Sequence, residues 1–111
     1  MGTDNSIPYG TLDLLILKLL SLEPTHGWGI SEWIQKTSAD SLRVGQGSLY
    51  ASLHRMTREG FIKSYWQDTD AGRRARYYAI TATGKKQLAR ETEHWTRLTR
   101  GVGLVLAANA V

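Results

Sequence analysis

The spacing of apolar side chains changes at Gly60, and this change constrains the fold more than any other feature of the chain. Before it, Leu49, Leu53 and Met56 recur at intervals of four and three, as on one face of a helix. After it, residues 61–66 and 75–80 are rich in aromatic and β-branched side chains and alternate like strands. A charged turn with one glycine separates them. The sequence therefore predicts a helix that runs into a β-hairpin.

Two further helices are expected ahead of this unit. Apolar residues recur at intervals of three and four over residues 11–23, with Thr11 as the expected cap and Pro24 as the stop. Residues 25–27 are expected to form a short turn, and residues 29–36 a second helix. A polar loop over residues 37–47 leads to the third helix, over residues 48–59, with Ser48 as its expected cap.

A long helix is expected after the hairpin, capped by Thr81 or Thr83 and reaching towards residue 108. Its apolar side chains follow a heptad pattern with one acidic break at Glu91. Such a pattern at the end of a chain predicts pairing with a second copy. The expected homodimer interface consists of Leu88, Trp95, Leu98, Val102 and Val105.

The order of these elements predicts a mainly α fold with a small β-hairpin: a winged helix-turn-helix followed by a long C-terminal dimerisation helix. We expect a flexible arm over residues 1–8, a DNA-binding domain over residues 9–81 and the dimerisation helix over residues 82–111. The length of 111 residues suits one domain.

The distribution of charge favours a nucleic-acid partner. Residues 43–76 hold seven Lys and Arg against three Asp and Glu, and residues 77–111 hold five against two. A basic surface of this kind suits phosphate, although many solvated faces are also basic. By contrast, residues 1–42 are acidic on balance.

The sequence lacks the residue patterns that several classes of enzyme and metal-binding protein require. There is no cysteine, and His26, His54 and His94 lack the spacing of metal ligands. Nucleophile, phosphate-loop and dinucleotide motifs do not occur either. We therefore expect no enzyme, no cofactor and no metal. No apolar stretch is long enough to cross a bilayer and no secretory signal is evident, so we expect a cytoplasmic protein without a membrane partner.

In a winged helix-turn-helix, the helix after the turn enters the major groove of double-stranded DNA, which is about 12 Å wide. Tyr50 could contact DNA or pack half-buried, and Arg55 could bind phosphate or be an ordinary surface charge. The hairpin arginines could contact phosphate or merely keep a turn soluble. The expected DNA contacts are Gln46, Gly47, Ser48, Tyr50, His54 and Arg55 on the helix and Arg73, Arg74 and Arg76 on the hairpin.

Five runs of residues resemble the PadR-like transcriptional regulators, in order and at that family's spacing. They are residues 10–20, His26-Gly-Trp-Gly-Ile30, Gln46-Gly-Ser-Leu-Tyr50, Leu53-His-Arg-Met56 and Gly72-Arg-Arg-Ala-Arg-Tyr-Tyr78 followed by Thr81. The resemblance implies a winged-helix domain, a dimer built on the C-terminal helix and repression of a nearby operon. The chain departs from the family at Ala51, where proline is common, and at Trp28, where tyrosine is common.

Trp95 has two readings. It is either an anchor of the dimer seam or, with its symmetry mate, one wall of a pocket for a small planar aromatic effector, which the resemblance supports. The other tryptophans, Trp28, Trp33 and Trp66, are expected in the core or an interface.

The favoured function is that of a homodimeric transcriptional regulator, with repression as the expected direction. Its two recognition helices are expected about one DNA turn apart, on an inverted-repeat operator. The alternative is a winged-helix protein-interaction module that does not bind DNA. Binding of double-stranded RNA fits poorly, because the A-form major groove is too narrow for a helix.

Overall fold

The computed structural model describes residues 7–8 and 10–110. Most of the expected flexible arm, residues 1–6, lies outside the described residues. Ile7, at the end of that arm, packs against the core. The elements run α1 (Thr11–Leu22), β1 (Thr25–His26), α2 (Gly27–Thr37), α3 (Gln46–Arg58), β2 (Ile62–Asp68), β3 (Arg74–Ile80) and α4 (Ala82–Leu106).

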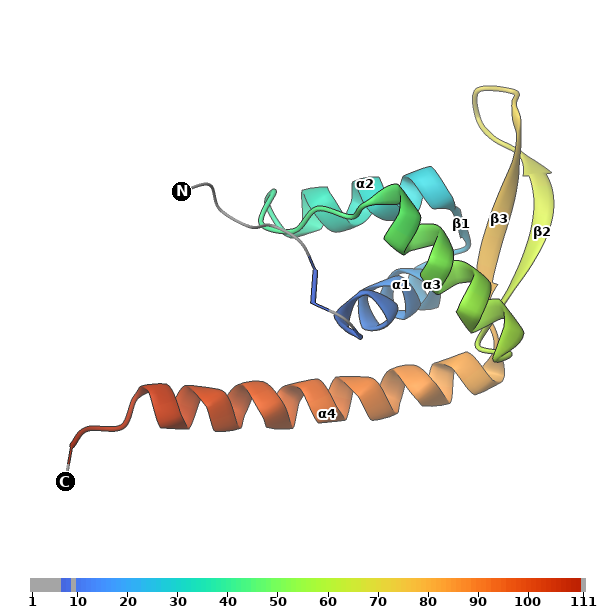
Figure 1. Cartoon of the computed structure of the whole chain (residues 1–111). Helices are drawn as coiled ribbons and strands as arrows, with labels where there is room; N and C mark the ends of the chain where they lie inside the picture. Colours follow the sequence, from blue (N-terminus) through green and yellow to red (C-terminus); the bar gives the residue numbers. More distant parts are fainter. Residues whose placement is uncertain (1–6, 9, 111) are drawn as a thin grey trace.

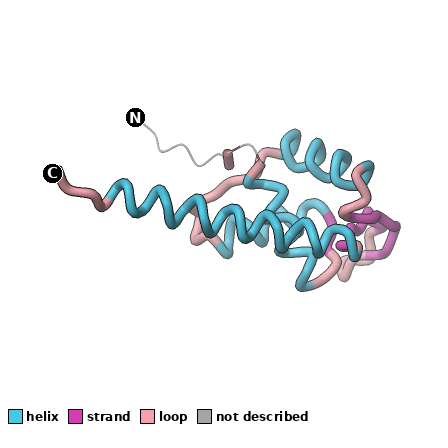
Figure 2. Tube along the Cα trace, turned by 90° about the horizontal axis from the view of Figure 1, so that it is seen from below, coloured by secondary structure: helices cyan, strands magenta, loops and turns pink. Residues whose placement is uncertain are grey.

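The predicted fold class is confirmed. In Figure 1, α1, α2 and α3 form a bundle with the β2–β3 hairpin rising beside it, and α4 runs along the opposite side of the molecule. Figure 2 shows, from below, that α4 continues well past the bundle towards the C-terminus. No helix in the described residues combines the length and apolar content that crossing a membrane requires.

The core lies where the apolar stripes of the helices meet the base of the hairpin. The stripe predicted on the third helix is confirmed, since its three members are fully buried. The largest fully buried side chains are Ile16, Leu17, Leu19, Ile30, Leu49, Leu53, Met56 and Ile62.

The sheet contains a strand that the sequence did not predict. The order is β1-β3-β2, with both pairings antiparallel. Thr25 pairs with Tyr78 and His26 with Tyr77, so the expected turn over residues 25–27 is wrong. A strand of two residues is too short to show alternation, and its pairing is decided by β3 from a distant part of the sequence.

The starts of the helices also differ from expectation. Gly10, with a φ of 88°, precedes α1, so Thr11 is its first residue and not its cap. Extended Gly45 caps α3 through its carbonyl, which accepts a hydrogen bond from the amide of Leu49 at 2.9 Å. Ser48 therefore lies inside the first turn and is not the cap. For α4, Thr81 is confirmed as the cap, because its hydroxyl accepts from the amide of Gly84 at 3.0 Å.

The beginning of α4 is fixed to the bundle. A Cβ at Gly84 would overlap the carbonyl oxygen of Phe61, so the backbones meet here with no room for a side chain. Leu88 is half-buried and packs against the core of its own chain. The helix α4 contacts α1 of its own chain. The expected place of Leu88 in a dimer seam stays a prediction.

Candidate nucleic-acid interface

The first turn of α3 is open on one face. Gln46, Gly47 and Ser48 are exposed, as is His54 further along the helix. Among the described residues, no side chain caps the amide groups of this turn. Such amides, together with the positive end of the helix dipole, are well suited to a phosphate oxygen.

Tyr50 combines the two roles that the sequence left open. The residue is 41% exposed, yet its hydroxyl lies over Gly27, where a Cβ would come within 2.8 Å of it. The side chain also lines a small cavity of about 160 Å³ between the start of α2 and the edge of β3. Tyr50 therefore joins α3 to the hairpin and still presents part of its ring to solvent.

Tyr78 lies at the base of the same cavity and is buried. Burial raises the pKa of its phenol above 10.0, with nearby Arg76 opposing the shift and Tyr50 adding to it. The hydroxyl therefore stays protonated at neutral pH and contributes no charge to this surface.

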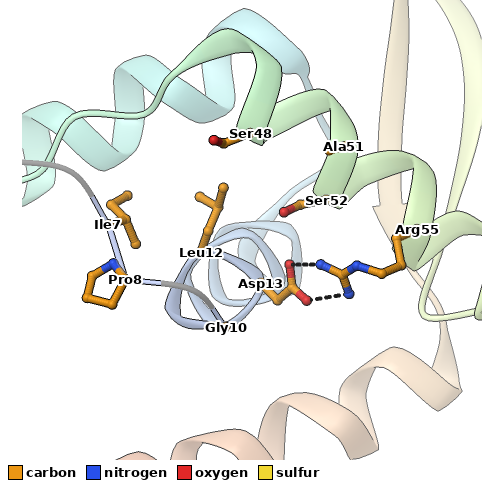
Figure 3. A pocket seen from close by; sticks show the side chains of 9 residues that line it. All are labelled: Ile7, Pro8, Gly10, Leu12, Asp13, Ser48, Ala51, Ser52 and Arg55. Carbon is orange, nitrogen blue, oxygen red and sulfur yellow. Dashed lines mark hydrogen bonds and ion pairs between the residues drawn. The ribbon is translucent and has the colours of Figure 1, made fainter.

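Arg55 is engaged within the protein. Its guanidinium meets the carboxylate of Asp13 on α1 in a two-point contact, at 2.7 and 2.9 Å (Figure 3). The Arg55 side chain is 34% exposed and that of Asp13 13%. We expected this guanidinium on the outward face, whereas the structure turns it to α1, where it fixes the position of α3.

The ion pair borders a cavity of about 310 Å³ between the start of α1 and α3. Figure 3 shows Ser48 and Ser52 on the α3 side of this cavity and Ile7 and Pro8 across from them. The exposed turn of α3 therefore faces the N-terminal part of the chain across this cavity.

The hairpin separates its three arginines. Arg74 and Arg76 are two residues apart on β3, so their side chains lie on one face of the sheet. Arg73 belongs to the turn, where its carbonyl accepts from the amide of Thr69 at 2.7 Å and its amide donates to the Thr69 hydroxyl at 3.3 Å. Of the three arginines expected to contact DNA, Arg74 and Arg76 therefore form a pair on β3, and Arg73 lies apart from them in the turn.

Two of the tryptophans lie outside the core of the chain. Trp28 is 66% exposed at the start of α2, where it stacks on His26. Trp66 is 55% exposed on β2, with Arg74 and Arg76 against its ring. Trp33 packs against the core as expected. In the hairpin, Trp66 stands directly across from Arg76.

The far half of α4 carries an uncovered apolar face. Trp95, Leu98, Val102 and Val105 are all exposed, Trp95 by 43% and Val102 by 49%. Trp95 and Leu98 also line a groove of about 510 Å³ between α4 and the start of α1. In Figure 1, the far half of α4 and the tip of the hairpin lie at opposite ends of the molecule, and the start of α3 lies nearer to the hairpin.

Known proteins share this fold. The model of the transcriptional regulator PadR-like family matches residues 16–90. A PadR-like transcriptional regulator from Bacillus cereus is 29% identical, with a TM-score of 0.79 over 90% of this chain and 95% of its own. A transcriptional regulator from Clostridium thermocellum is 30% identical, with a TM-score of 0.78 over 89% of this chain and 92% of its own.

A further relative covers a similar share of the chain. An uncharacterised protein from Lysinibacillus sphaericus is 29% identical over 97 residues, which are 87% of this chain and 89% of that protein.

The fold and the exposed helix beside an arginine-bearing hairpin define a winged-helix transcriptional regulator, a DNA-binding class and not an enzyme class. More narrowly, the chain belongs to the PadR-like family of transcriptional regulators.

Proposed function

We propose that the protein is a homodimeric, sequence-specific repressor that binds an inverted-repeat operator. The observation that carries this proposal is the exposed first turn of α3, whose amides no side chain caps, together with the cavity wall that Tyr50 of this helix shares with Arg76 of the hairpin. A helix in the major groove and a wing on the flanking backbone are the two contacts that a winged helix makes with one half-site.

Each part of this surface has a distinct task. Gln46 reads base edges from the leading end of α3, while Ser48 and the amides around Gly47 hold a phosphate. Tyr50 and His54 continue the contact along the exposed face. The hairpin arginines, Arg73, Arg74 and Arg76, contact the backbone or the minor groove.

Arg55 acts on this surface indirectly. Its pairing with Asp13 holds α3 against α1 and so fixes the angle at which the first turn meets DNA. In our proposal it is a support for the contact residues and no longer one of them.

The dimer is formed by the exposed part of α4. Trp95, Leu98, Val102 and Val105 face a second copy. A two-fold axis through this seam sets two copies of α3 about one DNA turn apart, which matches an inverted repeat.

In the same proposal, Trp95 lines the binding site of a small-molecule effector. The groove it lines has a volume within the range of about 300–1,000 Å³ typical of small-molecule sites. A planar aromatic compound stacked between Trp95 and its symmetry mate would lie at the seam that sets the spacing of the two α3 helices. Its binding would favour one spacing over another and so release the operator.

Footprinting tests the proposal. On DNA from the region upstream of the protein's own gene, the dimer is expected to protect two stretches about one turn apart, related by an inverted repeat. Gln46→Ala should change which sequences are preferred, and Arg73→Ala should weaken binding to all of them alike. Protection of a single stretch would rule out the symmetric dimer on DNA. A folded dimer that binds no DNA would instead favour the protein-interaction module.

A further inference from the structure

An exposed indole holds the two β3 arginines together. The guanidinium carbons of Arg74 and Arg76 lie 5.7 and 5.5 Å from the ring centre of Trp66. Both distances fall within the limit of about 6 Å for a cation–π contact, and tryptophan is the strongest partner for it.

The register of the hairpin explains the stack. Trp66 stands directly across from Arg76, and Arg74 follows two residues away on the same face. This face is the continuation of the buried one, since Ile62 and Tyr78 lie on it nearer the base. Arg76 also shares a cavity wall with Tyr50 of α3. The stack therefore lies on the side of the hairpin that is turned towards α3.

The electrostatics indicate that this site is prepared for an anion. Two like charges stand side by side. Asp68 is the cross-strand partner of Arg74, but no carboxylate of the described residues comes within ion-pair distance of either guanidinium. Their repulsion is offset by the shared indole. Stacking occupies the flat face of a guanidinium and leaves its N–H edges able to donate to phosphate or base acceptors.

We propose that Trp66 is a positioning residue for DNA binding, which holds Arg74 and Arg76 as a pair that enters the narrow minor groove of A·T-rich DNA beside the site of α3. The inference rests on the proposed DNA-binding function. A narrow minor groove has an enhanced negative potential that attracts arginine, and two pre-arranged guanidiniums lose less freedom there than two mobile ones. The pair therefore gives the wing a preference for A·T-rich flanks.

Two duplexes of equal length test this inference, one carrying A-tracts spaced by one helical turn and the other G·C tracts at the same places. The wild-type protein is expected to bind the A-tract duplex about tenfold more tightly at one fixed salt concentration. Trp66→Leu keeps an apolar side chain but removes the ring, and should bring the two affinities to within about twofold. Trp66→Phe keeps an aromatic face and should retain most of the preference.

Two controls separate positioning from a general loss of structure or charge. Arg73→Ala removes a wing charge outside the stack, so it should weaken binding to both duplexes and leave their ratio unchanged. Ring currents of the indole should shift the side-chain proton resonances of Arg74 and Arg76 upfield, and this shift should vanish in Trp66→Leu while the rest of the spectrum stays folded.

The outcomes distinguish this inference from the function on which it rests. If the wild type binds its own promoter tightly but shows no A-tract preference, the inference is overturned and the proposed function stands. A Trp66→Leu variant that keeps the full preference overturns it as well. Failure of the wild type to bind any duplex overturns both.

Discussion

The carboxylate of Asp13 and the guanidinium of Arg55 join α1 to α3 at 2.7 and 2.9 Å, across 42 positions of sequence. The pair is mostly shielded from water on the Asp13 side, so its loss leaves a charge without its counter-charge. It is also the contact that sets how α3 lies on the bundle.

Asp13→Asn is expected to lower the free energy of unfolding by about 1–3 kcal/mol, between the values typical of exposed and of buried pairs. Urea unfolding measures this. Glu59→Gln is the matched control, because Glu59 is more exposed and its carboxylate lies 3.9 Å from Arg55. It should change stability by less than about 0.5 kcal/mol. Equal effects of the two variants would show that the Asp13 contact contributes no more to the free energy of unfolding than the Glu59 contact does.

Gly84→Ala is expected to destabilise the fold by about 2–4 kcal/mol, because its Cβ would overlap the backbone of Phe61. Backbone cannot move aside as a flexible side chain can. Gly47→Ala is the control, since nothing lies within 4 Å of a Cβ there. This second variant should leave stability unchanged or raise it by up to about 1 kcal/mol, because alanine favours a helix. An equal fall of the midpoint temperature of thermal unfolding in both variants would contradict the close approach at Gly84.

Val102→Glu is expected to convert the dimer to a monomer, since a carboxylate would be buried in the α4 seam. Sedimentation velocity measures the change. Thr96→Glu adds the same charge to an exposed position of α4 outside the heptad seam and should leave the dimer intact. A wild-type monomer, or a Val102→Glu dimer, would show that α4 does not form the interface.

Planar aromatic compounds are expected to quench the tryptophan fluorescence of the wild type through Trp95. Trp95→Leu, which keeps an apolar side chain in the seam, should abolish the quenching. Trp28→Ala removes a more exposed tryptophan on the other side of the molecule and should not. Quenching that survives in Trp95→Leu, or its absence across a broad panel of compounds, would argue against an effector site at the seam.

The sequence predicted those parts of the fold that depend on periodicity. The stripe of Leu49, Leu53 and Met56, the change of period at Gly60 and the long helix after Thr81 each involve neighbours along the chain, and each was found in the structure. Local spacing is sufficient there because burial acts on one face of an element at a time.

The remaining features depend on contacts between distant segments. Asp13 on α1 forms an ion pair with Arg55 on α3, and the short strand β1 forms through its pairing with β3. The cap of α3 illustrates a different reason: serine is the better cap in isolation, yet the extended backbone at Gly45 starts the helix earlier. The stack of Trp66 with Arg76 follows from a cross-strand register that is fixed only once the hairpin is built.

The central claim, sequence-specific DNA binding, is tested most directly by one pair of binding isotherms. The full-length protein is titrated onto DNA from upstream of its own gene and onto a scrambled duplex of the same composition, at two salt concentrations. We predict tight binding to the upstream DNA, about a thousandfold or more above the scrambled duplex, with salt weakening both. Equal, steeply salt-dependent binding to the two duplexes would contradict the account, because it would leave only a basic surface without sequence recognition.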